Sequence, residues 1–368
     1  MRKYVYMLVV IWAASSLEAA SQILRSRAEL PPVAKSINKA YDFDYFFPFK
    51  EDDTLHLTKE QKRKELDLRY ASIKKEIKAV ANDSIRQRYG KINDDAYLNF
   101  RLRLARDTTE EYRELISRIN PNDSISLINY LPQRFINYHQ EGDFDNDWGN
   151  DLTAYGLEYL RVMRQYITNP YVKHALLESC AHEVLSYGKN YSDIDLFWKP
   201  FIDYAAEDTM VINKYQFKVD AIKRTKSGTK AIDFTFDDTE GKKHHLSDIF
   251  GKYLYIDCWA TWCGPCCKEI PFLEKQVEAM KNDKRISFIS ISLDKNRNAW
   301  LQKLKKGNPS WSQYIVDTEG LSVLSRQWGV TGIPRFIIIS PDGKIVDADA
   351  FRPSDHDFIE KMTQIIAQ

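Results

Sequence analysis

Cysteine is scarce in this sequence and unevenly placed. The 368 residues contain five cysteines, and four of them lie between Cys258 and Cys267. A disulfide framework would spread its cysteines along the chain, so this crowding favours a reactive site. A structural zinc site would need a second ligand pair at comparable spacing, and none follows. The pattern therefore predicts a redox dithiol, with no metal and no cofactor.

An excess of charge of one sign is also lacking. The chain has 53 Lys and Arg residues against 52 Asp and Glu residues, a formal net charge of +1. This balance gives no support to a nucleic-acid partner. Beyond Tyr4–Ala14 no apolar run approaches membrane-spanning length, and that run is itself too short to span a bilayer comfortably.

The N-terminus has the pattern of a secretory signal peptide. Arg2 and Lys3 precede the apolar run, and small residues follow at 15–21. We predict a signal peptide at 1–20 and export to the periplasm or cell envelope, with no stable membrane insertion after cleavage. An uncleaved anchor is the alternative.

Residues 21–225 are predicted to form an all-helical domain. Thr58 and Gln61 have capping-box spacing, and Leu66, Tyr70, Ile73 and later apolar residues recur at helical intervals. The aromatic alternation at 41–46 predicts a short strand or an anchored loop. Further helical patterns occupy 109–120, 124–139, 151–168, 171–187, 193–206 and 209–223.

The periodicity changes after a polar stretch at 223–230, which we interpret as a linker. Residues 226–368 then alternate strand and helix patterns, as in an α/β domain of typical size. The predicted strands are 231–236, 242–246, 253–258, 286–293, 311–316, 336–340 and 344–348, and the predicted helices are 264–281, 299–305, 321–328 and one starting near 354–357.

A Trp-Cys-Gly-Pro-Cys motif follows the strand at 253–258. It places Cys263 and Cys266 at the start of a helix, where partial positive charge stabilises a thiolate. The first thiolate can attack a substrate disulfide, and the second cysteine, one helical turn on, can resolve the mixed disulfide. The proline suits the first turn of a helix because its missing N–H costs nothing there.

Resolution requires Cys266 to lose a proton inside an apolar site, so a nearby carboxylate is expected to help. Asp257 lies in the middle of an apolar strand, where an unpaired carboxylate would be costly. Glu269 lies about one helical turn beyond Cys266. Either residue could be the proton acceptor, and the strand position favours Asp257. The alternative for Glu269 is a solvated helix residue.

Residues 231–368 resemble the thioredoxin fold, and more specifically the exported bacterial TlpA/ResA-like thiol-disulfide oxidoreductases. The resemblance rests on the Trp262–Cys266 motif, the hairpin before the active-site strand, the extra helix and strand within 296–316, and Gly332-Ile333-Pro334. It covers only the last two-fifths of the chain.

The resemblance implies roles for individual residues. Cys263 would be the exposed nucleophile and Cys266 the buried resolving thiol, together forming the redox-active disulfide. Pro334 would be a cis-proline that leaves the Ile333 backbone free to pair with a substrate strand; an ordinary trans proline is the alternative. The implied substrate-contacting residues are Trp262, Gly264, Pro265, Ile333 and Pro334.

Two cysteines depart from the family pattern. Cys258 stands where Phe is usual, and we interpret it as a small buried hydrophobe. Cys267 stands where Lys is usual. It is either a bystander or a third thiol that competes with Cys266.

The function predicted from these residues is an exported thiol-disulfide oxidoreductase that reduces protein disulfides. Its expected partners are protein disulfide substrates and a membrane-embedded electron donor. One alternative is a peroxiredoxin-like thiol peroxidase, although the Thr and Pro constellation that activates peroxide is not found around Cys263. The other is an envelope binding protein whose helical domain dominates, with an accessory redox domain.

Overall fold

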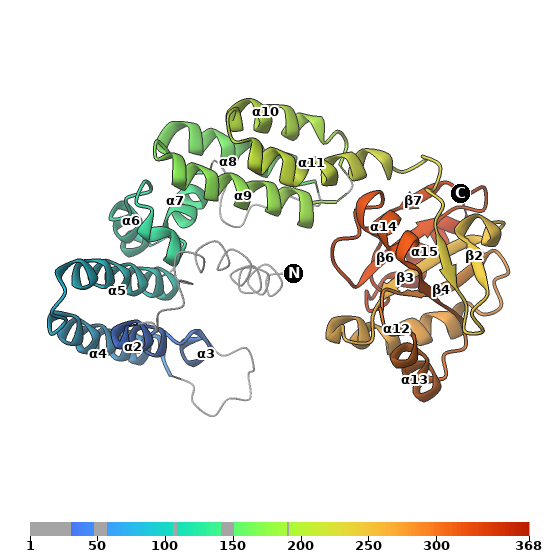
Figure 1. The fold of residues 1–368 in the computed structure, drawn as a ribbon, viewed down its shortest axis with the longest axis horizontal. Helices are drawn as coiled ribbons and strands as arrows, with labels where there is room; N and C mark the ends of the chain where they lie inside the picture. The colour runs from blue at the N-terminus through green and yellow to red at the C-terminus, as the bar shows by residue number, and fades with distance from the viewer. Residues whose placement is uncertain (1–30, 48–56, 106–108, 141–150, 190, 368) are drawn as a thin grey trace. The chain divides into compact units, whose positions relative to one another are not determined.

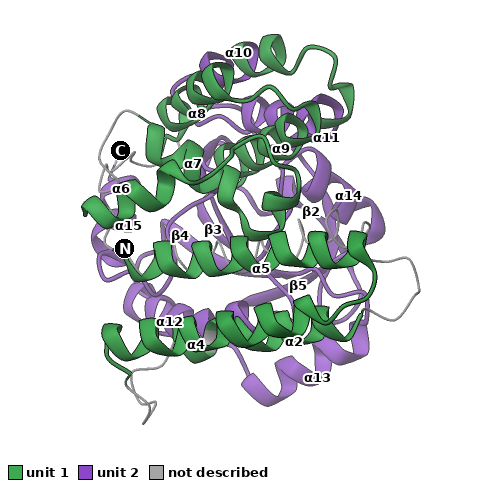
Figure 2. Ribbon diagram, turned by 90° about the vertical axis from the view of Figure 1, so that its left-hand side faces the viewer, with its two compact units in different colours: residues 1–186, 200–211 green, residues 187–199, 212–368 purple. Residues whose placement is uncertain are grey.

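The computed structural model describes residues 31–47, 57–105, 109–140, 151–189 and 191–367. The predicted signal peptide lies outside these residues. The chain divides into two compact units, Met1–Ser186 with Pro200–Val211, and Tyr187–Lys199 with Ile212–Gln368 (Figure 2). The domain boundary predicted at 225/226 differs from this division, because it lies where the helices end and the strands begin. It stays a prediction. None of the helices in the described ranges is long and apolar enough to cross a bilayer.

The region before the sheet is helical, as predicted (Figure 1). Its elements are α2 (Pro32–Ala40), α3 (Phe43–Phe46), α4 (Lys59–Lys78), α5 (Asp83–Leu104), α6 (Glu110–Ser117), η1 (Ile125–Asn129), α7 (Leu131–His139), α8 (Thr153–Tyr166), α9 (Pro170–Tyr187), α10 (Asp195–Ala205) and α11 (Thr209–Arg224).

The predicted start of α4 is confirmed. Gln61 donates its backbone N–H to Thr58 Oγ1 at 3.2 Å, and Thr58 donates its own N–H to Gln61 Oε1 at 2.8 Å. This reciprocal pair satisfies two donors that a helix start leaves free. The buried face of α4 carries Leu66, Ile73 and Ile77.

The prediction for residues 41–46 is wrong, because residues 43–46 form the short helix α3. Phe46 is fully buried and packs edge-on against Phe100 of α5, with ring centroids 5.3 Å apart. Tertiary packing of aromatic rings therefore overrides the local alternation. Helix α5, which was not predicted, supplies the other side of this contact.

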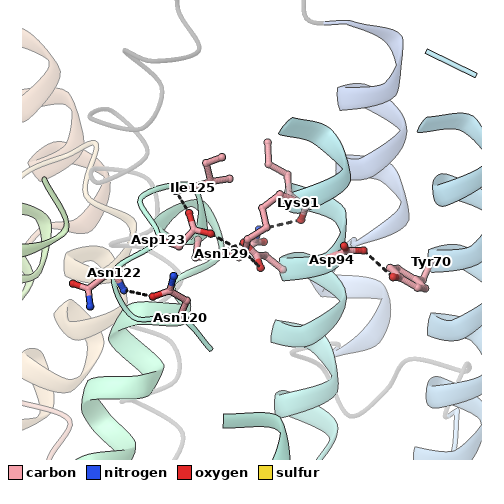
Figure 3. Close-up of polar contacts among 11 residues, drawn as sticks. Tyr70, Lys91, Asp94, Asn120, Asn122, Asp123, Ile125 and Asn129 are labelled. Carbon is pink, nitrogen blue, oxygen red and sulfur yellow. Dashed lines mark hydrogen bonds and ion pairs between the residues drawn. The ribbon is translucent and has the colours of Figure 1, made fainter. Parts of the chain in front are cut away.

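Polar contacts join α5 to its neighbours (Figure 3). Tyr70 of α4 donates its hydroxyl to Asp94 Oδ1 at 2.7 Å. Lys91 Nζ lies 3.1 Å from Asp123 Oδ2, and Asp123 Oδ1 accepts the Ile125 backbone N–H at 2.9 Å. These contacts tie α4, α5 and η1 together within the helical region.

The C-terminal part is a mixed seven-stranded sheet of order β2-β1-β5-β4-β3-β6-β7, with interleaved helices. Strands β3, β4 and β5 are parallel, and their neighbours run antiparallel to them. The elements are β1 (Thr235–Asp237), β2 (Lys243–His245), η2 (Leu246–Ile249), β3 (Tyr253–Trp259), α12 (Gly264–Met280), β4 (Ile286–Ser292), α13 (Arg297–Gly307), β5 (Ser312–Val316), α14 (Thr318–Arg326), β6 (Arg335–Ile339), β7 (Ile345–Asp347) and α15 (Phe358–Ile366).

Side chains of strand β3, which lies between β4 and β6, alternate between two cores. Ile256 and Cys258 join the core that includes Leu324 of α14. Tyr255 belongs to the opposite core, built with α12 and α15. Because the period of a strand is two, Asp257 and Trp259 share the face of Tyr255. Asp257 and the first turns of α12 therefore lie on the same side of the sheet.

Candidate active site

Cys263 is the N-cap residue of α12, directly after the turn that leaves β3. Its Sγ forms a disulfide with Cys266 and accepts the Cys266 backbone N–H at 3.2 Å. Pro265 occupies the first turn, where no N–H is required. The sequence thus folds locally as predicted, with the sulfur pair at the positive end of the helix.

The predicted exposure of Cys263 is wrong for this disulfide-bonded state. Cys263 is 6% exposed and Cys266 is 2% exposed, and both belong to an apolar cluster with Trp259 and Trp300. Trp262, in contrast, is 71% exposed and marks the open side of the site.

Ile333 contacts the disulfide although it lies 70 residues further along the chain than Cys263. The Ile333–Pro334 peptide bond is cis, as the resemblance implied. The Ile333 carbonyl oxygen lies 3.7 Å from Cys263 Sγ. Strand β6 explains this meeting, because it starts at Arg335 and pairs there with Cys258 of β3.

Asp257 is a buried carboxyl group, 4% exposed, in the middle of β3. Its Oδ2 accepts the Ser290 hydroxyl at 2.9 Å. Burial raises the pKa of Asp257 to about 7, and the charge of Glu269 adds to that rise, while the Ser290 hydrogen bond opposes it. A carboxyl group with this pKa can both accept and release a proton near neutral pH.

Glu269 is buried as well, so its interpretation as a solvated residue is wrong. It accepts the Ser354 backbone N–H at 3.1 Å and the Ser354 hydroxyl at 3.0 Å. Arg352 Nη1 lies 3.5 Å from Glu269 Oε1. These partners fix α12 to the segment that precedes α15, a structural role that sequence reasoning did not propose.

Residues 251–345 match a family model described as thioredoxin-like. The thiol-disulfide oxidoreductase ResA of Bacillus subtilis (strain 168) is 30% identical over 119 residues, which are 32% of this chain and 64% of that protein. The chain carries a thioredoxin-like domain related to ResA. A helical region precedes it.

Two solved Bacteroides vulgatus proteins are also similar to this domain. One, assigned to the thiol-disulfide oxidoreductases, shares 37% identity, with 39% of this chain and 98% of that chain covered and a TM-score of 0.36. The other is the thioredoxin domain of a thiol-disulfide oxidoreductase, with 27% identity, 38% and 97% coverage and a TM-score of 0.35.

The remaining cysteines of the thioredoxin-like domain are free thiols. Cys258 is fully buried on the face of β3 away from the disulfide, and burial, followed by the charge of Asp257, raises its pKa to about 12. This agrees with its interpretation as a small hydrophobe. Cys267 is half-buried, and its thiol contacts the Thr261 carbonyl oxygen at 3.8 Å. Both alternatives for Cys267 stay open.

Sequence reasoning missed Asp294, which holds the turn before Cys263. Its carboxylate accepts the Thr261 backbone N–H at 2.8 Å and the Thr261 hydroxyl at 2.7 Å. Ser292 donates its hydroxyl to the same carboxylate at 2.7 Å. A carboxylate directly after the second buried strand was the available signal, because β3 and β4 are parallel and end at the same edge.

Ser290 and Trp311 were missed as well. Ser290 lies at the site because β4 pairs with β3, and Trp311 lies there because it directly precedes β5.

In the described part of the chain, no three His, Cys, Asp or Glu side chains are grouped as metal ligands.

Proposed function

We propose that this protein is a thiol-disulfide oxidoreductase that reduces disulfide bonds in protein substrates. The observation that carries the proposal is the Cys263–Cys266 disulfide at the start of α12, facing the Ile333 carbonyl beside Pro334. The curated relatives of the domain are thiol-disulfide oxidoreductases, and they support the same chemistry. Because the chain spans 64% of the length of the Bacillus subtilis protein, its activity as a whole protein is inferred.

The reaction starts from the reduced dithiol. The Cys263 thiolate attacks one sulfur of a substrate disulfide, and the other substrate sulfur leaves as a thiolate and takes a proton. The Cys266 thiolate then attacks Cys263 Sγ and releases the second substrate thiolate, which is also protonated. Two electrons pass to the substrate, and the protein is left with the disulfide seen here.

Asp257 is the proposed acceptor of the Cys266 proton. It lies on the same sheet face as α12, and its pKa of about 7 leaves a substantial ionised fraction at neutral pH. Glu269 is favoured less, because Ser354 donates hydrogen bonds to both of its oxygens.

The substrate is proposed to lie across the open side of the site. Trp262, Gly264 and Pro265 are exposed there, whereas both sulfurs are buried. The Ile333 backbone is positioned to pair with an extended substrate segment, so binding would bring the target disulfide onto Cys263.

We also propose that the protein is exported and works in the periplasm or cell envelope. The N-terminal basic, apolar and small-residue pattern supports export. In an oxidising compartment the dithiol must be regenerated, so the proposed partner is a membrane-embedded donor of electrons.

Reduction of insulin by the dithiothreitol-reduced protein tests the proposed activity. We expect the wild type to accelerate insulin precipitation and the Cys263→Ala variant to lose the acceleration. Cys180→Ala, at a buried thiol in α9, is the matched control and should retain it. Equal rates for wild type and Cys263→Ala would refute the proposal.

Whether the protein acts as a reductant or an oxidant is tested by measuring the reduction potential of the Cys263–Cys266 disulfide. The measurement is a titration of the Cys258→Ala/Cys267→Ala variant against glutathione buffers. We expect a potential close to that of reducing thioredoxins, about −270 mV. A value near that of strong disulfide-forming proteins, about −120 mV, would overturn the reductant role.

A further inference from the structure

Ser290 lies between two buried polar groups of the thioredoxin-like domain. Its hydroxyl oxygen is 2.8 Å from Trp311 Nε1 and 2.9 Å from Asp257 Oδ2. Ser290 is 2% exposed, and in the parallel pairing of β3 with β4 it is the residue opposite Asp257.

The direction of both hydrogen bonds follows from the donor groups. An indole N–H can only donate, so Ser290 Oγ must accept from Trp311. The single hydroxyl hydrogen of Ser290 is then directed to its other partner, the Asp257 carboxylate. The three residues form a chain in which each bond polarises the next one in the same sense.

The other influences on Asp257 raise its pKa. Burial and the Glu269 charge on α12 both favour the protonated acid. Tyr255 and Cys258, also on β3, carry no charge near neutral pH because burial raises their pKa values. In the described part of the chain, Ser290 is the one hydrogen-bond donor to the Asp257 carboxyl group. Ser290 is thus the main contact that favours the carboxylate.

We propose that Ser290 and Trp311 are positioning residues that hold Asp257 Oδ2 and leave Oδ1 to take the proton from Cys266. This proposal rests on the thiol-disulfide oxidoreductase function proposed above. In the step concerned, the Cys266 S–H bond breaks and Asp257 gains the proton. The Cys266 thiolate then forms its bond to Cys263 Sγ, and the electron pair of the broken mixed disulfide leaves with the substrate thiolate.

The proposal predicts how substitutions change the resolution step. Without the Ser290 hydroxyl, the ionised form of Asp257 loses its hydrogen-bond donor, so a higher pH is needed to ionise it. Ser290→Ala should therefore move the inflection of resolution rate against pH upward by about one unit, equivalent to a tenfold change in proton affinity. Trp311→Phe should move it in the same direction by less, because the Ser290 hydroxyl is then free to rotate.

The experiment is a single-turnover reaction of the reduced protein with insulin between pH 5 and 9. Acid quenching and mass spectrometry separate the mixed disulfide from the resolved Cys263–Cys266 disulfide, so the two steps are timed independently. Ser290→Thr should restore the wild-type profile, since it keeps the hydroxyl.

Trp328→Phe is the matched control for Trp311→Phe. Trp328 donates its indole N–H to the Ile232 carbonyl at 2.9 Å and packs on the sheet face away from Asp257. It should leave the inflection unchanged. Equal inflections in wild type, Ser290→Ala and Trp311→Phe would overturn the positioning role. No reduction of insulin by the wild type at any pH would instead refute the proposed function. If Ser290→Ala does not fold, Trp311→Phe alone decides.

Discussion

Asp257 on β3 and Glu269 on α12 are both buried carboxyl groups, but they are held in different ways. Asp257 receives one hydrogen bond, from Ser290, whereas Glu269 receives two from Ser354 and lies within ion-pair distance of Arg352. After burial and the opposing Ser290 bond, the Glu269 charge is the remaining influence on the Asp257 pKa, and it raises that pKa. One carboxyl group is thus anchored, and the other is left able to exchange a proton.

The buried Asp257 carboxyl group should lower the stability of the oxidised protein as pH rises. Its pKa is about 7 in the folded protein against 3.8 for the ordinary side chain, so folding favours the protonated form. Wild-type stability therefore falls between about pH 4 and pH 7, by about 4 kcal/mol for a shift of this size. Asp257→Asn removes this loss. Urea unfolding should find the variant more stable than wild type by about 2–4 kcal/mol at pH 8 and equal at pH 4.

A stability difference between wild type and Asp257→Asn that stays the same from pH 4 to pH 8 would contradict this account. Asp294→Asn is not a suitable control, because that carboxylate holds the turn before Cys263. Asp349→Asn, at a partly exposed ion pair with Arg335, serves better.

Glu269→Gln should weaken the fold while leaving thiol chemistry in place. The two Ser354 donors bind different carboxylate oxygens, and the amide NH2 group that replaces one of these oxygens cannot accept a hydrogen bond. We therefore expect a loss of about 1–2 kcal/mol in the free energy of unfolding. Removing the Glu269 charge should also lower the Asp257 pKa, and the resolution profile should move to lower pH. Urea unfolding and the pH profile check both effects. Abolished resolution at every pH would make Glu269 the proton acceptor instead.

The local motif was predictable, but its partners were not. The Trp262–Cys266 stretch, the preceding apolar strand and the helix after it carry their own signals, and they fold as predicted. Ser290 and Trp311 give no such signal, because their proximity to Asp257 depends on the register between β3 and β4. Strand register is a tertiary property, so no local pattern could identify this chain of hydrogen bonds.

Helix α5 shows the same limit in the helical region. Its buried face includes Asn93, Asp95 and Asn99, which interrupt the apolar periodicity that identified its neighbours. Arg134 Nε donates a hydrogen bond to Asn99 Oδ1 at 2.6 Å, and the Ser126 hydroxyl donates one to Asp95 Oδ2 at 2.8 Å. These partners come from distant segments, so the helix is stable although its sequence does not have the expected pattern.

Gly320 should be intolerant of alanine because α14 packs closely on β1. An added Cβ would lie 2.1 Å from the Thr235 carbonyl oxygen and 2.7 Å from Val316 Cγ2. Since the backbone oxygen cannot rotate away, α14 must shift, and we expect a loss of about 2–3 kcal/mol. Gly307→Ala, in α13, is the control: its Cβ would meet no described atom within 4 Å, and helix propensity favours alanine by up to about 1 kcal/mol. Equal urea midpoints for the two variants would show that the close approach is relieved easily.

The most direct test of the central claim is to trap the mixed disulfide. The reduced Cys266→Ala variant, mixed with insulin and digested after alkylation, should yield a stable adduct at Cys263, identified by peptide mass spectrometry. The Cys263→Ala/Cys266→Ala variant should yield none, although it keeps Cys258 and the half-buried Cys267. An adduct at Cys267, or none at Cys263, would contradict the assignment of Cys263 as the nucleophile and Cys266 as the resolving thiol.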